Sequence, residues 1–262
     1  MFVDSHCHLE MEDFEKDRHE VIEKSLREGL QYMLTVGTEE KYFSKVIEII
    51  EYYPAVYGAI GIHPHNSKDY NGQLEKIIDT FLKNKKIVAY GEIGLDFFKN
   101  YSPRESQINA FQAQIEVARK AKLPVIIHSR SAKDETIQIL RNTCDVMTAG
   151  IIHCYSYDLT AVKKFLDMGF TISFPGTITY KNAHDLVDVV RYTPMDRILA
   201  ETDAPFLTPH PHRGKRNEPV FVKVTIEKIA QIKGQKIEEI ATQLTQNFEK
   251  LFLKDTIWGG RN

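Results

Sequence analysis

Histidine and carboxylate side chains follow short apolar runs at widely separated points of this chain. Each run is short and rich enough in β-branched residues to predict a buried strand, and the polar residue stands at or just after its end. Side chains so far apart in the sequence meet only if the fold gathers many strand ends in one place, as a parallel barrel does. The residues concerned are His6 with His8, Glu92, His128, His153 and Asp203.

Eight candidate strands alternate with segments of helical periodicity. The strands are expected at residues 2–5, 32–36, 55–60, 87–91, 125–128, 150–153, 170–174 and 198–201. This alternation predicts an α/β fold of the TIM-type (β/α)8 barrel class, which a single domain covering residues 1–262 would fill. An open, doubly wound sheet is the alternative fold. It is weakened because the first strand is not followed by a Gly-x-Gly-x-x-Gly motif.

Two further segments carry helix signals. Residues 102–105 read Ser-Pro-Arg-Glu, a capping box with proline at the first helical position, and predict where the helix after the fourth strand begins. Residues 236–252 carry apolar side chains at helical spacing. We expect from them an extra C-terminal helix that packs on the barrel, in preference to a helix that pairs two copies of the chain.

The composition excludes several classes of protein. A net charge of −2 is unlike the basic profile of a general nucleic-acid binder, so an anionic substrate must be neutralised locally. No apolar run reaches the roughly 18 residues that a membrane span requires, and the N-terminus does not resemble a signal peptide. Cys7, Cys144 and Cys154 form no CxxC pair, which favours a reducing, cytoplasmic setting. We expect Cys7 and Cys154, next to His6, His8 and His153, to be small buried thiols that pack behind the site and not metal ligands.

The first and last strand ends provide the donors for one cation. His6 and His8 stand two apart on an extended segment, so both imidazoles point the same way and can bind one ion. Asp203 can ligate the same ion and accept a proton from an attacking water. It can also serve as an N-cap in the turn before Pro205. Glu201 is a competitor for the acid–base role if the strand continues to Asp203.

The middle strands provide the donors for a second cation. Glu92 ends the fourth strand between glycines, and a carboxylate can bridge two cations with its two oxygens. His128 and His153 end successive strands, and as neutral imidazoles they can hold the second ion. The residues alone therefore predict a dinuclear metal site and a hydrolase. The choice among Mg²⁺, Mn²⁺, Zn²⁺, Fe²⁺, Ni²⁺ and Co²⁺ stays open.

The motifs together resemble the TatD family of metal-dependent DNases, within the wider amidohydrolase-like barrels. The matching segments are DSHCHL at 4–9, GIHPH at 61–65, GEIGLD at 91–96, LPVIIHSR at 123–130, GIIHC at 150–154, ETDAP at 201–205 and RGKRNEP at 213–219. The resemblance implies His6, His8, Glu92 and Asp203 on one metal, and Glu92, His128 and His153 on the other. It also implies 3′–5′ nuclease activity on DNA.

Basic residues near the strand ends are the candidates for substrate binding. His63 and His65, after the third strand, can contact a phosphate, or they can be solvated imidazoles in a loop turn. Arg130 can clamp a phosphate, with a salt bridge to Asp134 as the alternative. The loop after the eighth strand, with Arg213, is expected to contact phosphate. Four aromatic residues are candidates to stack on a base: Phe97, Phe98, Tyr155 and Phe174.

The expected activity is hydrolysis of DNA phosphodiesters at single-stranded ends by a water that two divalent cations activate. Asp203 takes the proton, and Glu92 lies between the cations. The protein is expected to act as a monomer or weak oligomer without a membrane partner. A deacylase or esterase that uses the same site, for example on aminoacyl-tRNA, is the second hypothesis. A metal-binding scaffold without turnover is the third.

Overall fold

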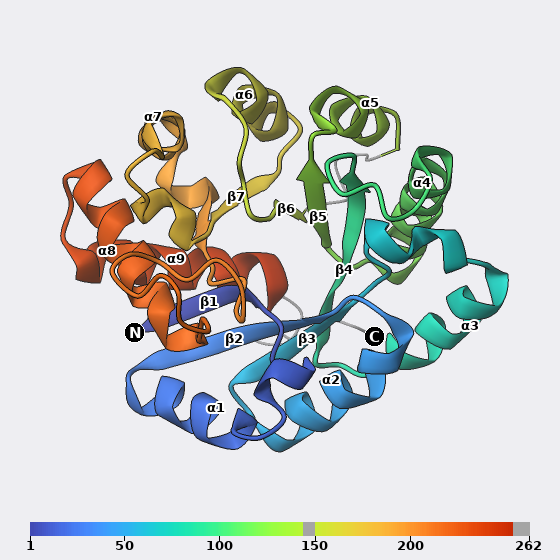
Figure 1. Ribbon diagram of the computed structural model, residues 1–262, viewed down its shortest axis with the longest axis horizontal. Helices are drawn as coiled ribbons and strands as arrows, with labels where there is room; N and C mark the ends of the chain where they lie inside the picture. Colours follow the sequence, from blue (N-terminus) through green and yellow to red (C-terminus); the bar gives the residue numbers. More distant parts are fainter. Residues whose placement is uncertain (144–149, 254–262) are drawn as a thin grey trace.

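The computed structural model describes residues 1–143 and 150–253. A sheet of eight parallel strands runs through it in the order β1-β2-β3-β4-β5-β6-β7-β8. Figure 1 shows the helices arranged outside these strands, as in a barrel. The strands are β1 (Phe2–Cys7), β2 (Leu30–Gly37), β3 (Val56–Ile60), β4 (Ile87–Asp96), β5 (Val125–Arg130), β6 (Gly150–Ile152), β7 (Thr171–Phe174) and β8 (Ile198–Ala200).

Hydrogen bonds from a side chain and from the segment after β8 nearly close the barrel between its first and last strands. The Oγ of Ser5 donates to the carbonyl of Ala200 at 3.0 Å. Beyond the end of β8, the backbone N–H of Asp203 donates to the carbonyl of His6 at 2.9 Å. Cys7 pairs with Ala204 as an isolated parallel bridge. The expected TIM-type barrel is therefore confirmed, and its seam places Asp203 directly beside the end of β1.

Helices follow the strands in the order expected of βα units. They are α1 (Arg18–Arg27), α2 (Glu40–Tyr52), α3 (Gly72–Phe81), α4 (Arg104–Ala121), α5 (Lys133–Thr143), α6 (Leu159–Asp167), α7 (His184–Tyr192), α8 (Val222–Lys233) and α9 (Ile237–Phe252). Short 3₁₀ turns join them: η1 (Glu12–Phe14), η2 (Pro64–Asp69), η3 (Gly176–Thr179), η4 (Met195–Arg197) and η5 (Pro219–Phe221). Among the described helices, none combines the length and apolar character that crossing a bilayer requires.

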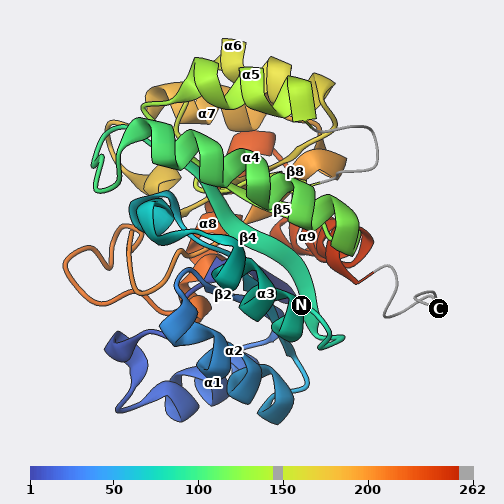
Figure 2. The same ribbon diagram turned by 90° about the vertical axis from the view of Figure 1, so that its right-hand side faces the viewer.

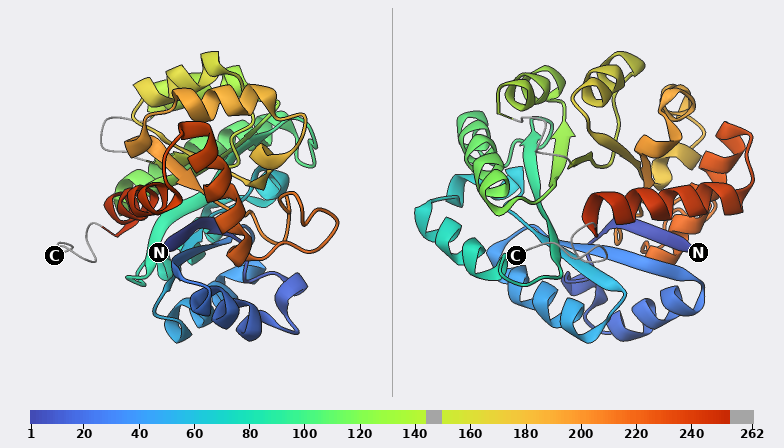
Figure 3. Two further views of the ribbon diagram at one scale, coloured as in Figure 1. Left: turned by 90° about the vertical axis from the view of Figure 1, so that its left-hand side faces the viewer. Right: turned by 180° about the vertical axis from the view of Figure 1, so that it is seen from behind.

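The expected extra helix at the C-terminal end is present as α9. Its apolar face is buried, and the ring of Phe248 stacks on Tyr32 of β2 with centroids 5.5 Å apart. The side chain of Asn247 donates to the carbonyls of Met195 and Ile198. Figure 3 shows α9 lying along the barrel near β1. In Figure 2 the loop that follows β8 projects from the opposite side of the molecule.

Four strands run further than expected, β1, β2, β4 and β5, and the extension is longest in β4. All ten residues of β4 are buried, and the strand continues to Asp96, so Glu92 lies inside it and not at its end. β5 likewise continues past His128 to Arg130. The extension pairs Gly94 with His128, where the two backbones approach so closely that a Cβ on Gly94 would lie 2.0 Å from the carbonyl oxygen of His128. Glycine at this position allows the close pairing that prolongs both strands.

The capping-box motif correctly marked where the helix after β4 begins, but the expected side-chain cap does not form. α4 begins at Arg104 with Pro103 at its N-cap, and no side chain of the described residues caps it. The hydroxyl of Ser102 instead donates to the carbonyl of His65 at 2.8 Å and accepts from the backbone N–H of Lys68 at 3.2 Å. The serine is buried, and the neighbouring 3₁₀ turn η2 takes up its hydrogen-bonding capacity.

Candidate metal centre

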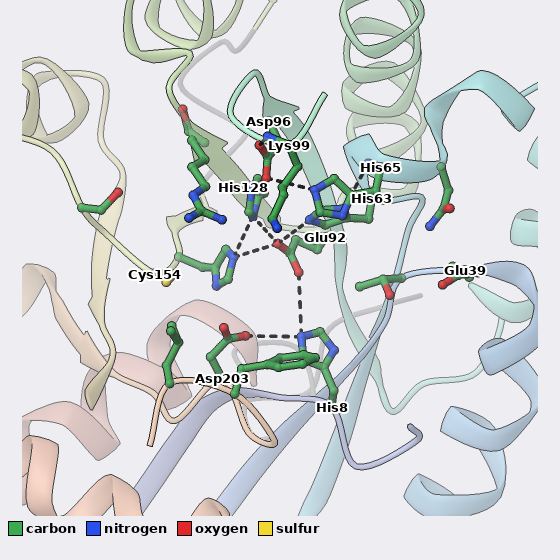
Figure 4. A pocket seen from close by; sticks show the side chains of 18 of the residues that line it. His8, Glu39, His63, His65, Glu92, Asp96, Lys99, His128, Cys154 and Asp203 are labelled. Carbon is green, nitrogen blue, oxygen red and sulfur yellow. Dashed lines mark hydrogen bonds and ion pairs between the residues drawn. The ribbon is translucent and has the colours of Figure 1, made fainter. Parts of the chain in front are cut away.

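The carboxylate of Glu92 lies at the centre of the site, buried among histidines. Its Oε1 is 2.7 Å from Nδ1 of His128 and 2.7 Å from Nε2 of His153. Its Oε2 is 3.4 Å from Nε2 of His6. The two oxygens of one carboxylate therefore face two different groups of donor atoms, as Figure 4 shows.

The first group of donors spans the seam between the first and last strands of the barrel. Nε2 of His6 and Nε2 of His8 are 3.2 Å apart. Oδ1 of Asp203 lies 3.4 Å from the His8 nitrogen and 3.7 Å from the His6 nitrogen. These three donor atoms are close enough to one another to hold a single metal ion. The structure thus brings together the donors that the sequence predicted on β1 and after β8.

The second group of donors comes from β4, β5 and the residue after β6. Nε2 of His153 lies 3.4 Å from Nδ1 of His128, and both face the same oxygen of Glu92. His63 joins them, because its Nε2 lies 3.4 Å from Oε1 of Glu92. A metal-compatible grouping accordingly includes His63, Glu92 and His128. His63, expected as a substrate contact, lies within reach of the cluster itself.

Two buried carboxylates stand behind the histidines, and the sequence did not indicate them. Nδ1 of His8 lies 3.2 Å from a carboxylate oxygen of Glu10 and 2.9 Å from the carbonyl of Val36. Nε2 of His128 lies 3.2 Å from Oδ2 of Asp96. A hydrogen bond to the outer nitrogen of a metal-binding histidine fixes its orientation and its tautomer. In the sequence, Glu10 and Asp96 are marked only by their place next to the strand-end motifs.

Glu201 and Asp203 point to different parts of the site. β8 ends at Ala200, and Asp203 has a left-handed backbone with φ of 55°. Glu201 does not share its direction: its Oε1 accepts from the N–H of Cys154 at 2.7 Å and lies 3.3 Å from Nδ1 of His153. The Glu201 side chain is 0% exposed, whereas that of Asp203 is 14% exposed. Water therefore reaches Asp203 and not Glu201.

The electrostatics of the cluster favour positive charge. Although burial opposes ionisation, the surrounding histidines, His153 foremost, hold the pKa of Glu92 well below its usual range. Burial lowers the pKa of His8 and His153 in isolation, but neighbouring carboxylates outweigh it and raise both well above the usual value. Burial lowers the pKa of His63 to about 4, so this imidazole is neutral. The ionised carboxylates that raise the pKa of His8 and His153 would attract a divalent cation in the same way.

The donor set fits metal ions. Nδ1 of His8 faces the acceptors Glu10 and Val36, so in the neutral imidazole that nitrogen carries the proton, and Nε2, 3.2 Å from Nε2 of His6, presents a lone pair to the cluster. The buried Nδ1 of His6 has no hydrogen-bond partner among the residues that the structure describes. Mixed imidazole and carboxylate donors are the usual ligands of Zn²⁺ and related divalent cations. A divalent cation in the cluster would accept such lone pairs.

A cavity of about 680 Å³ opens over the cluster. Of the four residues expected to bind substrate, His63, His65 and Arg130 line it, and Arg213 does not. His65 contacts Asp96, with Nε2 at 3.0 Å from Oδ2. The guanidinium of Arg213 lies over the ring of Tyr180, 4.3 Å from its centroid. Three of these side chains therefore adjoin the cluster, and the fourth lies outside the cavity wall.

Arg130 and Arg216 have different partners from each other. Arg130 makes no ion pair with Asp134 among the described residues; its guanidinium lies 4.1 Å from the centroid of Phe98 and stays available on the cavity wall. Arg216, in the loop after β8, binds both carboxylate oxygens of Asp17 at 2.9 and 2.6 Å. The expectation of phosphate contact by that loop therefore does not extend to Arg216, whose charge is already neutralised.

The expectations for cysteines and aromatic residues hold in part. Cys7 is buried behind the site, as expected, but Cys154 lines the cavity, because its left-handed backbone, with φ of 46°, interrupts the alternation after β6. Cys144 lies outside the described residues. Phe97, Tyr155 and Phe174 are buried and cannot stack on a base, whereas Phe98 is exposed.

Barrel and cluster together define a class of protein. A parallel eight-stranded barrel with a buried carboxylate between two sets of imidazole donors is the architecture of barrel metal-dependent hydrolases. A family model described as "TatD related DNase" matches residues 3–253. The chain therefore belongs to the TatD family of metal-dependent hydrolases.

Individual relatives support this assignment. The chain is 40% identical over 252 residues to YabD of Bacillus subtilis, an uncharacterized metal-dependent hydrolase, covering 96% of this chain and 99% of the relative. It is 31% identical over 245 residues to a protein of Erwinia tasmaniensis named 3′-5′ ssDNA/RNA exonuclease TatD, covering 91% and 95%. The crystal structure of YjjV, a TatD homologue from Escherichia coli, superposes with a TM-score of 0.90 at 30% identity, covering 96% and 98%.

Proposed function

We propose that this protein is a 3′–5′ exonuclease that hydrolyses DNA phosphodiesters at single-stranded ends with two divalent cations. The observation that carries the proposal is the position of Glu92, whose two oxygens face two separate groups of donors below an open cavity. The name of the Erwinia tasmaniensis relative supports the choice of substrate. We further propose that the chain acts as one cytoplasmic domain, as a monomer or weak oligomer.

The donor groups define which residues would hold the cations. In this proposal His6, His8 and Asp203 hold one cation, and His128 and His153 hold the other, with Glu92 between them. When bound, the cations supply a water of lowered pKa and offset the negative charge that builds on the phosphoryl oxygens. Their identity among Mg²⁺, Mn²⁺, Zn²⁺, Fe²⁺, Ni²⁺ and Co²⁺ is to be decided by reconstitution.

The chain's own side chains have separate tasks in the reaction. Asp203, the partly exposed carboxylate of the cluster, accepts the proton of the attacking water. Arg130 and the neutral His63 donate to non-bridging phosphate oxygens from the cavity wall. His65, beside Asp96, reaches the same phosphate oxygens. Arg213 contacts the DNA backbone further from the site. A net charge of −2 makes these local contacts necessary, because the protein as a whole does not attract DNA.

The first test removes the proton acceptor. Asp203→Asn in the metal-reconstituted protein is expected to slow release of nucleotides from a 5′-labelled single strand by roughly 10²–10⁴-fold, the usual contribution of a positioned general base. Asp188→Asn is the matched control, because Asp188 is an exposed carboxylate on α7 whose one ion pair among the described residues is with Arg191. Equal rates for Asp203→Asn and the wild type would refute the role of Asp203.

The second test addresses the substrate class. Wild-type protein, stripped with chelator and reloaded with each cation in turn, is given the labelled strand and an aminoacyl ester in parallel. We expect turnover of the strand, shortened from its 3′ end, and little turnover of the ester. The opposite preference would establish the deacylase alternative. Background rates on both substrates with every cation would establish a scaffold without turnover.

A further inference from the structure

The loop between β4 and α4 carries two exposed aromatic rings beside residues that line the cavity. Phe98 and Tyr101 are each 61% exposed, whereas Phe97 beside them is 9% exposed. Large apolar side chains in this barrel are otherwise mostly buried in the core. Exposing a ring to water forfeits the free energy of burying it, so two exposed rings in one short loop indicate a binding surface.

Positive charge accompanies both rings. The guanidinium of Arg130 lies 4.1 Å from the centroid of Phe98. The Nζ of Lys99, between the two aromatic residues in the sequence, lies 5.8 Å from the centroid of Tyr101. Lys99 and Arg130 both line the cavity, and Figure 4 shows Lys99 pointing into it. The two aromatic rings of the loop are thus exposed to solvent, whereas the positive charges of Lys99 and Arg130 line the cavity above the candidate metal centre.

The loop is fixed to the cluster and not merely adjacent to it. Oδ1 of the buried Asp96 accepts from the backbone N–H groups of Phe98 at 3.0 Å and Lys99 at 2.8 Å. The other oxygen, Oδ2, contacts His65 and His128. The ring of Tyr101 meets the ring of His65 edge-on, with centroids 4.7 Å apart. One carboxylate therefore positions both a histidine of the candidate metal centre and the loop that carries the rings.

We propose that Phe98 and Tyr101 form a nucleobase-binding subsite, with Lys99 and Arg130 holding the adjoining phosphate. This inference rests on the proposed nuclease function and adds the means by which the site selects its substrate. Aromatic rings beside cations complement a ligand that is planar and apolar on its faces and anionic on its backbone. Base faces are accessible only in an unpaired strand, so the subsite favours single-stranded ends over duplex ends.

The test compares substrates that differ only in their bases. One is a short single strand of thymidine nucleotides, and the other carries abasic tetrahydrofuran residues at its last two 3′ positions. For Phe98→Ala combined with Tyr101→Ala, we expect kcat/KM on the thymidine strand to fall about fivefold to a hundredfold, mainly through KM. On the abasic strand the variant and the wild type should be equal.

Two controls separate stacking from general damage. Tyr192→Ala removes an aromatic ring that is 48% exposed at the end of α7 leading toward β8, and hence at the opposite end of the barrel. It should leave both substrates unaffected. Phe98→Trp should retain the activity of the wild type. Fluorescence anisotropy of a phosphorothioate strand, which resists cleavage, should show weaker binding to the double variant and unchanged binding to Tyr192→Ala.

The possible outcomes distinguish the subsite from the function on which it rests. Equal losses on the thymidine and abasic strands, or no loss on either, would overturn the subsite while leaving the nuclease proposal intact. If the wild type cleaves neither strand with any cation, the nuclease proposal itself fails. Unchanged anisotropy for the double variant together with unchanged kinetics would likewise remove any role for the rings.

Discussion

At the scale of single residues, the site depends on how each histidine directs its two nitrogens. His8 turns Nε2 toward Asp203 and Nδ1 toward Glu10, whereas His128 turns Nδ1 toward Glu92 and Nε2 toward Asp96. An imidazole can rotate or change tautomer unless its outer nitrogen is held. The buried acceptors behind these histidines therefore determine which lone pair a cation meets.

Asp96→Asn tests this arrangement. The substitution keeps the size of the side chain but removes the negative charge beside Nε2 of His128. We expect affinity for the divalent cation to fall by roughly 10–100-fold, measured by competition with a fluorescent chelator. Asp134→Asn, in the exposed first turn of α5, is the control and should bind as the wild type does. Unchanged affinity in Asp96→Asn would show that His128 is positioned by the strand alone.

The sequence predicted the candidate donor residues that the structure brings together, but not their partners. His6, His8, Glu92, His128, His153 and Asp203 can be found because each is a metal-binding residue type beside an apolar run. The role of Asp96 depends on the register that sets it opposite Arg130 and near His128, and register between strands is not visible in either strand by itself. The approach of His63 to Glu92 depends on η2, which the sequence did not indicate.

At the scale of secondary-structure elements, the pairing of β4 with β5 holds the centre of the site. The two strands run parallel beyond Glu92 and His128, with Gly94 opposite His128. The sequence predicted where both strands begin, because apolar β-branched runs mark their starts. It did not predict where they end, because the glycines and polar residues of 91–96 resemble a loop in composition although all are buried.

Gly94→Ala tests the close pairing. Its backbone has φ of 138°, and an added Cβ would lie 2.0 Å from the carbonyl oxygen of His128. We expect the free energy of unfolding to fall by about 2 kcal/mol or more, as for other overpacked sites, together with loss of cation affinity. Gly72→Ala is the control, because no atom of the described residues lies within 4 Å of the position that its Cβ would take. Urea denaturation measures the stability of both variants. Equal midpoints would show that the two strands accommodate the added Cβ without loss of stability.

At the scale of the whole molecule, the donor atoms connect parts of the chain that are far apart in sequence. They come from β1 and the residue after it, β4, β5, the residue after β6 and the segment after β8. The group of His6, His8 and Asp203 spans the seam between the first and last strands, where loop bonds replace a continuous ladder. A cation held there would link the first and last strands. It would bind only the folded state, because only the fold brings these donors together.

Removal of metal is therefore expected to lower the melting temperature. A cation at a hundred times its dissociation constant stabilises the folded state by about 2.7 kcal/mol. For a chain of this size, that corresponds to a rise of roughly 5–10 °C over the chelator-treated protein. Differential scanning calorimetry with increasing cation measures the shift, which should grow with concentration. Glu92→Gln, which removes the charge between the two donor groups, should lose most of the shift. Identical melting of stripped and reloaded wild-type protein would mean that the cluster does not bind the cation tested.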